Sequence, residues 1–179
     1  MIKIFIVAFI SLVFIAGCDK ADQDYEFELD EITVAELNKA YDSGKYSTVD
    51  VVTLYLSRIE ALNKQGPRLN AIISLNPDAL KIAIELDLER ATKGARGPMH
   101  GIPVLLKDNI DTKDNMPTTA GSIALKENYA KEDSPLAASL RAAGAIIIGK
   151  TNLSEWANFR STNSSSGWSG MGGQTRNPY

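Results

Sequence analysis

Hydrophobic residues recur along the chain at two spacings, and each spacing predicts a different kind of element. In three stretches, 33–44, 47–66 and 77–94, apolar positions lie three or four residues apart, the pattern of one face of a helix. Thr33 and Ser47 favour the helix N-cap and stand at the start of the first two stretches. The patterns predict three amphipathic helices, of which the third should bury one apolar stripe: Leu80, Ala83, Ile84, Leu88 and Ala91.

Short runs that are apolar almost throughout separate the helical stretches and predict buried strands. These runs are residues 69–75, 102–106 and 145–148. Strands that are apolar on both faces and alternate with helices are typical of an α/β fold. We therefore expect a mainly parallel or mixed sheet that is covered by helices.

Two more helices are expected in the second half of the chain, followed by a segment of different character. Ser134, followed by a proline, predicts a helix that ends at Gly144. Asn152 or Ser154 should begin a short helix that includes Phe159. Residues 161–179 are mostly Ser, Thr, Asn and Gly and could build no packed element alone, so we expect a floppy tail or a loop of a larger protein.

The first seventeen residues predict a lipoprotein signal peptide. Lys3 precedes an apolar run at 4–16, which is shorter than the roughly 20 residues that a membrane-spanning helix needs. Residues 15–18, Ile-Ala-Gly-Cys, resemble a bacterial lipobox, in which Cys18 receives the lipid. An uncleaved N-terminal anchor with an incidental cysteine is the alternative. Either interpretation places the remaining chain outside the cytoplasmic membrane, in a bacterial cell envelope.

The expected organisation therefore has three parts. Residues 1–17 form the signal peptide, residues 18–29 form a polar tether, and residues 30–179 form the folded domain. The partner at the N-terminus would be the membrane, through the lipid on Cys18.

The composition excludes several kinds of functional site. The 179 residues include one Cys and one His, which excludes an internal disulfide and the usual zinc sites. The formal net charge of −3 argues against a nucleic-acid partner, because such proteins normally present a basic surface. We expect no metal site.

Two motif matches in the sequence do not support the functions that these motifs usually indicate. Residues 144–151 fit the phosphate-loop pattern G-x-x-x-x-G-K-[ST], but the middle residues are Ala-Ile-Ile-Ile, which favour a buried strand over an anion-binding loop. We expect a turn and a strand there, and no nucleotide. Residues 167–171 nearly match the G-x-S-x-G elbow, but Met171 replaces the last glycine. A triad would also need His100, which stands in a Gly/Pro turn and is expected to be structural.

Lys107 is the candidate for chemistry. It ends the apolar run 102–106, and the carboxyl ends of strands in α/β folds are where ligands usually bind. A lysine acts as a general base only as the neutral amine, and burial away from water favours that form. We therefore expect Lys107 to be buried at the strand end; a solvated lysine paired with Asp108 or Asp111 is the alternative.

Four segments together resemble the amidase signature family, and its bacterial peptide-amidase branch most of all. They follow one another in order and include Lys107: residues 97–108, 119–122, 143–156 and 167–179. The resemblance implies an incomplete amidase-signature fold, with residues 30–179 as the N-terminal part of an amidase domain. It also implies no metal or organic cofactor, and a small-molecule or peptide amide as the substrate.

The resemblance assigns roles as well. Family members hydrolyse amides with a lysine, a serine in a cis peptide and a nucleophilic serine, and Lys107 matches the lysine. Both serines normally follow the segment that ends here at Tyr179, so we expect this chain to be inactive alone. Trp156 and Ala157 are candidates for substrate contact. A lipid-anchored binding protein derived from an amidase, without catalysis, is the alternative function.

Overall fold

The computed structural model describes residues 27–159, 161–163 and 165–179. Contacts divide the chain into two units, residues 1–30 and 31–179. The predicted signal peptide, Cys18 and most of the predicted tether lie outside the described residues. At the end of the predicted tether, the N–H of Asp30 donates to the carbonyl of Phe27 (2.8 Å), and Phe27 and Leu29 are buried. Within the described residues, no helix is long and apolar enough to cross a membrane.

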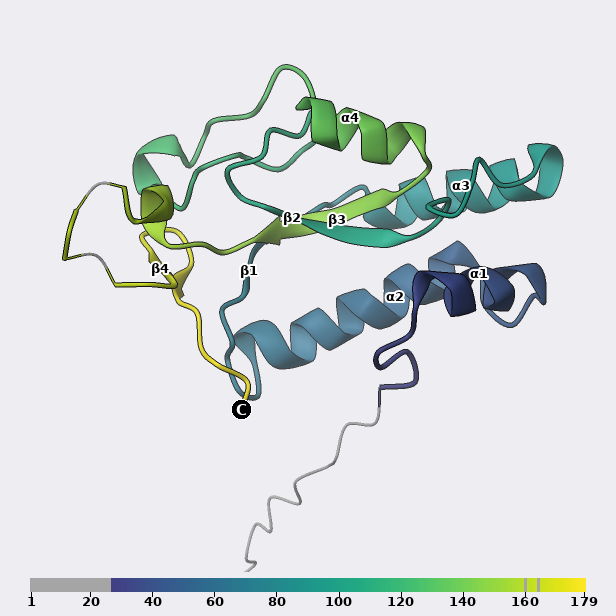
Figure 1. Cartoon of the computed structure of the whole chain (residues 1–179), viewed down its shortest axis with the longest axis horizontal. Helices are drawn as coiled ribbons and strands as arrows, with labels where there is room; N and C mark the ends of the chain where they lie inside the picture. The colour runs from purple at the N-terminus through teal and green to yellow at the C-terminus, as the bar shows by residue number, and fades with distance from the viewer. Residues whose placement is uncertain (1–26, 160, 164) are drawn as a thin grey trace, which may run out of the picture. The chain divides into compact units, whose positions relative to one another are not determined.

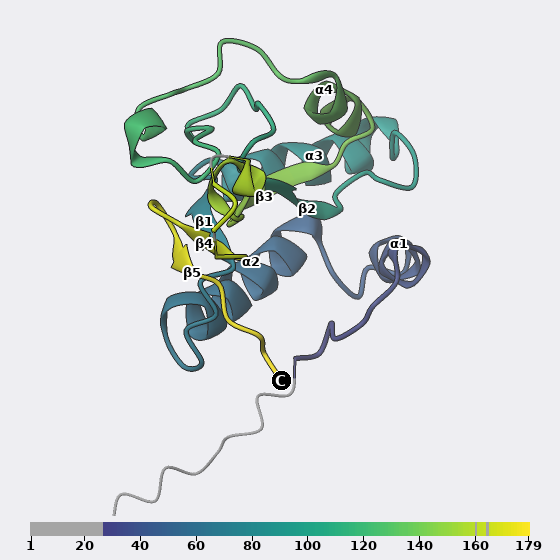
Figure 2. The same ribbon diagram turned by 60° about the vertical axis from the view of Figure 1, so that its left-hand side comes forward.

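A mixed three-stranded sheet lies at the centre of the second unit (Figures 1 and 2). Strand β3 (Ile146–Thr151) lies between β1 (Ile72–Leu75) and β2 (Pro103–Lys107). Strand β2 runs parallel to β3, and β1 runs antiparallel to it. The predicted α/β fold with a mixed sheet covered by helices is confirmed.

Helices cover both faces of the sheet because residues of β3 point alternately to each face. Ile146 and Ile148 pack in one core against α2 (Thr48–Ile59) and α3 (Ala79–Lys93). Ile147 packs in a second core on the other face, with α4 (Pro135–Ala142). In Figure 1, α4 lies on the opposite side of the sheet from α2. The two cores hold the ends of β2 and β3 in place.

Side-chain caps set the helix starts as the sequence predicts. Thr33 begins α1 (Val34–Asp42) and Ser47 begins α2, each in a reciprocal capping box with an acidic residue three positions on. Ser134 caps α4, and its hydroxyl accepts the N–H of Ala137 (3.3 Å). After α2 the chain continues in a wider π turn, Glu60–Lys64.

The stripe predicted for the third helix is wrong. Leu80, Ile84 and Leu88 are 41%, 59% and 65% exposed. Of the predicted stripe only Ala83 is buried, and the other buried residues of α3, Ala79 and Leu86, were not part of it. Small alanine side chains let α3 pack closely against β3 and α2, and this line of residues lies on a different face from the leucine line.

The first strand is shorter than predicted. Only Ile72–Leu75 pair with β3, whereas Leu69 and Asn70 donate their N–H groups to carbonyls of the π turn, those of Leu62 and Asn63. The Asn63 side chain then binds Ile72 on both sides, accepting its N–H at 2.9 Å and donating to its carbonyl at 2.8 Å. Bonds to the preceding turn thus replace sheet pairing at Leu69 and Asn70.

The serine-rich end forms a hairpin rather than a floppy tail, and it is held by contacts to residues outside the segment. Strands β4 (Trp168–Ser169) and β5 (Gly173–Gln174) pair as an antiparallel hairpin. Ser169 is buried, and its hydroxyl donates to Oδ1 of Asn152 (2.7 Å) and accepts the N–H of Gly172 (2.9 Å). Nδ2 of Asn152 donates to the carbonyl of Gly173 (3.1 Å). Side-chain hydrogen bonds to a distant asparagine therefore take the place of an apolar core.

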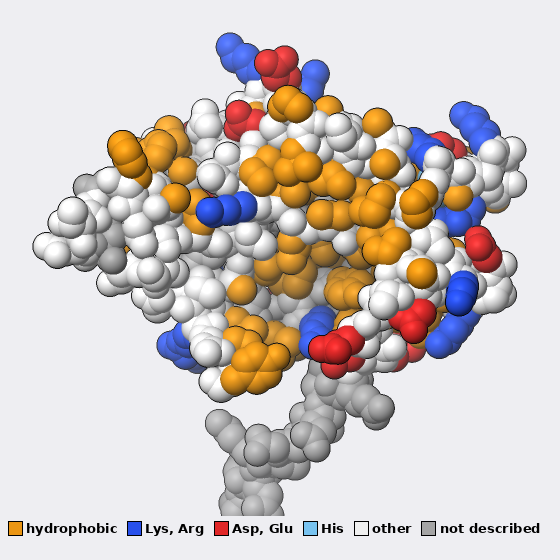
Figure 3. Space-filling model, in the orientation of Figure 1, with side chains coloured by type: hydrophobic (Ala, Val, Ile, Leu, Met, Phe, Trp, Pro, Cys, Tyr) orange, Lys and Arg blue, Asp and Glu red, His pale blue; other side chains and the backbone are white. Residues whose placement is uncertain are grey.

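Hydrophobic side chains also gather on the surface. Figure 3 shows them across the middle of the face that Figure 1 presents. A groove of about 190 Å³ has mostly apolar walls, which include Tyr55, Ile59, Leu62, Leu105 and Ile148. Strands β1 and β2 form the two edges of the three-stranded sheet.

Candidate active site

The candidate site lies where β2 and β3 end. Lys107 is the last residue of β2 and pairs with Thr151 of β3. The next residue, Asp108, donates its N–H to the carbonyl of Thr151 (3.1 Å), so the chain stays attached to β3 as it leaves the sheet. The backbone at Lys107 is therefore held in place at the end of the strand.

The environment of Lys107 differs from the prediction. Its side chain is exposed, so the expected burial is wrong for the part of the chain that the structure describes. The alternative, pairing with Asp108 or Asp111, is not found either, because no ion pair joins Lys107 to these two carboxylates. The sheet places this amine at the strand end but leaves it open to solvent.

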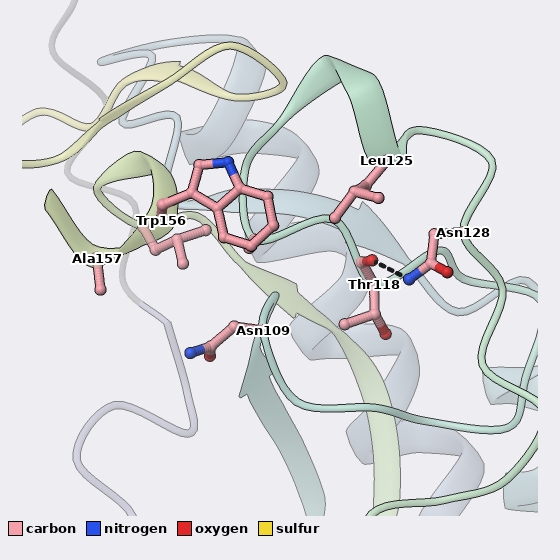
Figure 4. Close-up of a pocket in the computed structure, with 8 residues that line it drawn as sticks. Asn109, Thr118, Leu125, Asn128, Trp156 and Ala157 are labelled. Carbon is pink, nitrogen blue, oxygen red and sulfur yellow. Dashed lines mark hydrogen bonds between the residues drawn. The ribbon is translucent and has the colours of Figure 1, made fainter. Parts of the chain in front are cut away.

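A cavity of about 310 Å³ opens beside this strand end (Figure 4). Both predicted substrate-contact residues, Trp156 and Ala157, line it, as does Asn109, two residues after Lys107. The full lining is Asn109, Thr118, Ala120, Leu125, Asn128, Leu153, Trp156 and Ala157. The cavity therefore combines large apolar groups with two carboxamide side chains and a hydroxyl.

The walls come from three segments that are far apart in the sequence. In Figure 4 the indole ring of Trp156 extends toward Leu125, while Asn109 and Ala157 lie together on the opposite side. Asn128 secures the wall near Leu125, because its Nδ2 donates to the carbonyl of Thr118 (2.8 Å) and its carbonyl accepts the N–H of Thr118 (2.9 Å). Asn128 and Thr118, which line the cavity, are thus held by hydrogen bonds to backbone groups.

The helix predicted through Trp156 is wrong. The segment Glu155–Asn158 is a short 3-10 turn in which Trp156 (φ 52°, ψ 31°) and Ala157 (φ 52°, ψ 36°) are left-handed. Asn158 is left-handed as well, with φ 63°. Non-glycine residues avoid this region, and such strain is concentrated at functional sites. The conformation is held in part by a hydrogen bond from the N–H of Trp156 to the carbonyl of Ala120 (3.0 Å).

Lys150 is the buried lysine, and sequence reasoning missed it. The segment 144–151 forms a turn and then β3, which confirms the predicted strand. Lys150 is fully buried, and its Nζ donates to the carbonyl of Ile110 (2.8 Å) and to the hydroxyl of Thr118 (2.9 Å). Burial lowers its pKa, and the nearby Asp108 carboxylate opposes that shift. A lysine next to a run of isoleucines was the signal available in the sequence.

Asp108 is the second buried charged group that the sequence did not single out. It is fully buried, and its carboxylate accepts hydrogen bonds from the backbone and the hydroxyl of Thr119. Burial raises the pKa of Asp108, whereas the donors of Thr119 and Gly121 and the charge of Lys150 oppose that change. The loop after β2 is therefore fixed by one buried cation and one buried carboxyl group.

His100 is structural, as the sequence predicts. It is fully buried, its Nε2 donates to the carbonyl of Leu86 (2.9 Å), and its Nδ1 accepts the N–H of Arg96 (3.2 Å). A carbonyl can only accept and an amide N–H can only donate, so both ring nitrogens are engaged in one tautomer. In the described part of the chain, no three His, Cys, Asp or Glu residues are grouped so that they could hold a metal ion.

The fold and this site define an α/β protein with an amine at a strand end beside a mainly apolar cavity. Residues 50–179 match the Amidase family, and the chain belongs to that family.

Solved structures of peptide amidases are similar to the described chain. The peptide amidase of Stenotrophomonas maltophilia is 54% identical with a TM-score of 0.83, over 86% of this chain and 31% of that one. A peptide amidase in complex with the competitive inhibitor chymostatin matches with the same figures. A Schizosaccharomyces pombe relative, whose name assigns it to the amidases, is 46% identical over 151 residues. These residues are 84% of this chain and 25% of that protein. The chain thus spans between a quarter and a third of the length of these relatives.

Proposed function

We propose that this protein hydrolyses the C–N bond of a carboxamide and that Lys107 is its general base. The observation that carries the proposal is the position of Lys107 in a chain of the amidase family. It ends a central strand, two residues before the wall of a cavity that also contains Trp156 and Ala157.

The proposed reaction follows the roles that the family resemblance implies. The neutral amine of Lys107 takes a proton from one serine, which takes the proton of a second, nucleophilic serine. The oxygen of the second serine bonds to the amide carbonyl carbon, and the C–N bond breaks as the nitrogen receives a proton. Water then hydrolyses the acyl-enzyme to the acid and regenerates the serine. Neither serine is assigned to a residue of this chain.

The exposure of Lys107 gives substrate binding a part in this scheme. A lysine is a base only as the neutral amine, and removal from water favours that form, so the proposed role requires that water be removed from around Lys107. We propose that a bound acyl group, seated in the cavity beside Asn109, excludes this water. Desolvation on binding is a recognised way in which enzymes activate polar groups.

The cavity suggests the class of amide. Its volume of about 310 Å³ lies at the small end of ligand sites, and the walls include Trp156, Leu125 and Leu153 beside Asn109 and Asn128. We propose an acyl group with an apolar or aromatic side chain, whose own amide groups bond to the asparagines. The peptide amidase that resembles this chain supports a peptide amide.

A chimaera provides the test. Residues 31–179 of this chain replace the matching segment of the Stenotrophomonas maltophilia peptide amidase, and ammonia release from N-acetyl-phenylalaninamide is measured. We expect turnover in the chimaera and a loss of about a thousandfold in its Lys107→Met variant, the scale of general acid–base catalysis. Lys113→Met, a second exposed lysine of the same loop region, is the matched control and should retain activity.

Two outcomes would contradict the proposal. A folded chimaera that binds the amide without hydrolysing it would favour the non-catalytic binding protein, and equal activity of Lys107→Met and Lys113→Met would remove Lys107 from the reaction. The 179-residue chain alone should release no ammonia, because none of its described hydroxyl groups is hydrogen-bonded to the Lys107 amine. Turnover by that chain which disappears in Lys107→Ala would refute this expectation.

We further propose that the protein is a lipoprotein of the bacterial cell envelope, anchored through Cys18. The support is the sequence of residues 1–18, a short apolar run followed by a lipobox-like segment. The amide substrate would then be met outside the cytoplasmic membrane.

A further inference from the structure

The carboxylate of Asp108 directs its hydrogen bonds to one short turn. Its Oδ2 accepts the hydroxyl of Thr119, the N–H of Thr119 (3.3 Å) and the N–H of Gly121 (3.4 Å). Its Oδ1 is buried and has no hydrogen-bond partner in the described part of the chain. The carbonyl of Asp108 accepts two more N–H groups, those of Thr119 (3.1 Å) and Ala120 (2.9 Å). Residues 119–121, the 119–121 turn, thus direct all three backbone N–H groups to Asp108, and the N–H of Gly121 is shared with the hydroxyl oxygen of Thr119 (3.0 Å).

The carbonyl groups of the 119–121 turn bind two segments that are distant in the sequence. The carbonyl of Ala120 accepts the N–H of Trp156 (3.0 Å), and the carbonyl of Gly121 accepts the N–H of Met171 (2.9 Å), between β4 and β5. The turn is also close to the hairpin, because a Cβ on Gly121 would lie 2.5 Å from the Cβ of Ser169. With φ +77°, Gly121 has two reasons to lack a side chain.

The turn itself is held in an unfavourable conformation. Ala120 has φ 49°, in the left-handed region, as do Trp156 and Ala157 across the hydrogen bond. Such a conformation persists only where surrounding contacts determine it. The contacts that determine Ala120 are those of Asp108, because its carbonyl and its carboxylate bind the N–H groups on both sides of the Ala120 side chain.

We propose that Asp108 is a positioning residue, which acts through the 119–121 turn to fix Trp156 and Ala157 relative to Lys107. The path is short. Asp108 follows Lys107 directly, Ala120 lines the cavity, and Ala120 binds the backbone of Trp156. The distance between the amine and the cavity wall is thus set by one buried carboxyl group. The functional meaning of this arrangement rests on the proposed amide hydrolysis.

Backbone amide hydrogen exchange in the full 179-residue chain tests the inference. Thr119→Val removes the hydroxyl that donates to Asp108 and accepts the N–H of Gly121 (3.0 Å), with little change of shape. We expect exchange at the amides of Trp156 and Met171 to become about tenfold faster or more, because local opening of the turn frees both. The amide of Ile146, which is bonded to the carbonyl of Ile102 in the sheet, should be unchanged.

Matched variants separate positioning from general stability. Thr119→Ser keeps the hydroxyl and should restore slow exchange at both amides. Thr112→Val removes another fully buried hydroxyl, which donates to Asp114 (3.0 Å), and should leave Trp156 unaffected. Asp108→Asn keeps an acceptor but loses the charge, and should accelerate exchange at Trp156 as Thr119→Val does.

Two results would overturn the inference. One is unchanged exchange at Trp156 in Thr119→Val and Asp108→Asn, and the other is equal acceleration at Trp156 and Ile146, which would indicate global destabilisation. Exchange does not depend on turnover. An inactive chimaera with the expected exchange rates would therefore reject the proposed function alone, whereas normal exchange with an active chimaera would reject the positioning role alone.

Discussion

Two lysines at neighbouring strand ends have opposite surroundings, and the register of the sheet explains the difference. Val104 pairs with Ile147, but Leu105 pairs with Gly149, so Ile148 has no partner on β2. After this irregularity Lys150 pairs with Leu106, and paired residues of a parallel ladder point to the same face. Leu106 belongs to the core under α4, and Lys150 is accordingly buried beneath the loop that follows β2.

Replacement of Lys150 by methionine should lower stability at pH 7 by about 1–3 kcal/mol. The variant removes the donor to the part-buried carbonyl of Ile110 (2.8 Å) and to the buried hydroxyl of Thr118 (2.9 Å), and loss of a partner by a buried polar group is costly. Lys113→Met, at an exposed position, should change the free energy of unfolding by less than about 0.5 kcal/mol. Urea unfolding of both variants measures the difference.

The same lysine should make stability depend on pH in the alkaline range. Burial lowers the pKa of Lys150 below its ordinary 10.5, so the unfolded chain holds a proton that the folded chain has released between those two values. The stability advantage of the natural chain over Lys150→Met should therefore grow as the pH rises toward 10.5. A constant or shrinking difference would contradict the burial of this amine.

At the scale of elements, local patterns predict what local forces determine. The N-caps at Thr33, Ser47 and Ser134 follow from residues next to one another, and the structure confirms them. The apolar run 145–148 also predicts a strand, which the structure has at Ile146–Thr151. The hairpin near Ser169 depends on Asn152, and the turn at Trp156 depends on Ala120, over long sequence separations. These contacts join residues that no local periodicity relates, so the pattern predicts a floppy tail or a loop for residues 161–179 and a helix through Trp156.

Lys107 could be selected from its position at a strand end, with its role assigned by the family resemblance, whereas Trp156 and Ala157 were selected from the resemblance alone. That the last two line one cavity beside Asn109 is a result of the fold. The roles of Asp108 and Lys150 were out of reach for the same reason as the hairpin. Their partners, Thr119 and Thr118, stand 11 and 32 positions away.

The left-handed turn at 156–158 should store strain that a glycine can relieve. Ala157→Gly is expected to raise the free energy of unfolding by about 0.5–1 kcal/mol, because the gain at φ 52° exceeds the added entropy of the unfolded chain. Ala91→Gly in the exposed part of α3 is the matched control and should lower it by about 1 kcal/mol. If urea unfolding shows equal losses in both variants, Ala157 is not strained.

At the scale of the molecule, the described sheet has two open edges and an apolar surface. Its three strands leave β1 and β2 each with one unpaired side, and Leu80, Ile84 and Leu88 are exposed along α3. Unpaired strand edges and exposed apolar side chains favour association. The relatives are three to four times as long as the segment they share with this chain, so the same residues lie in a larger fold there.

The proposal that concerns the whole chain is the lipid anchor, and substitution of Cys18 tests it. When the chain is expressed in a bacterium, we expect removal of residues 1–17 and incorporation of labelled palmitate, because the lipobox-like segment places a thiol at the cleavage point. Cys18→Ser should abolish labelling and leave the precursor uncleaved, whereas Ser11→Ala, inside the apolar run, should change neither. One acyl chain binds membranes weakly and several bind them stably, so the labelled chain should sediment with membranes and Cys18→Ser should lose the lipid contribution to that binding. Palmitate incorporation into the Cys18→Ser chain, or its absence from the natural chain, would reject the lipoprotein assignment and leave the uncleaved anchor as the explanation for residues 1–17.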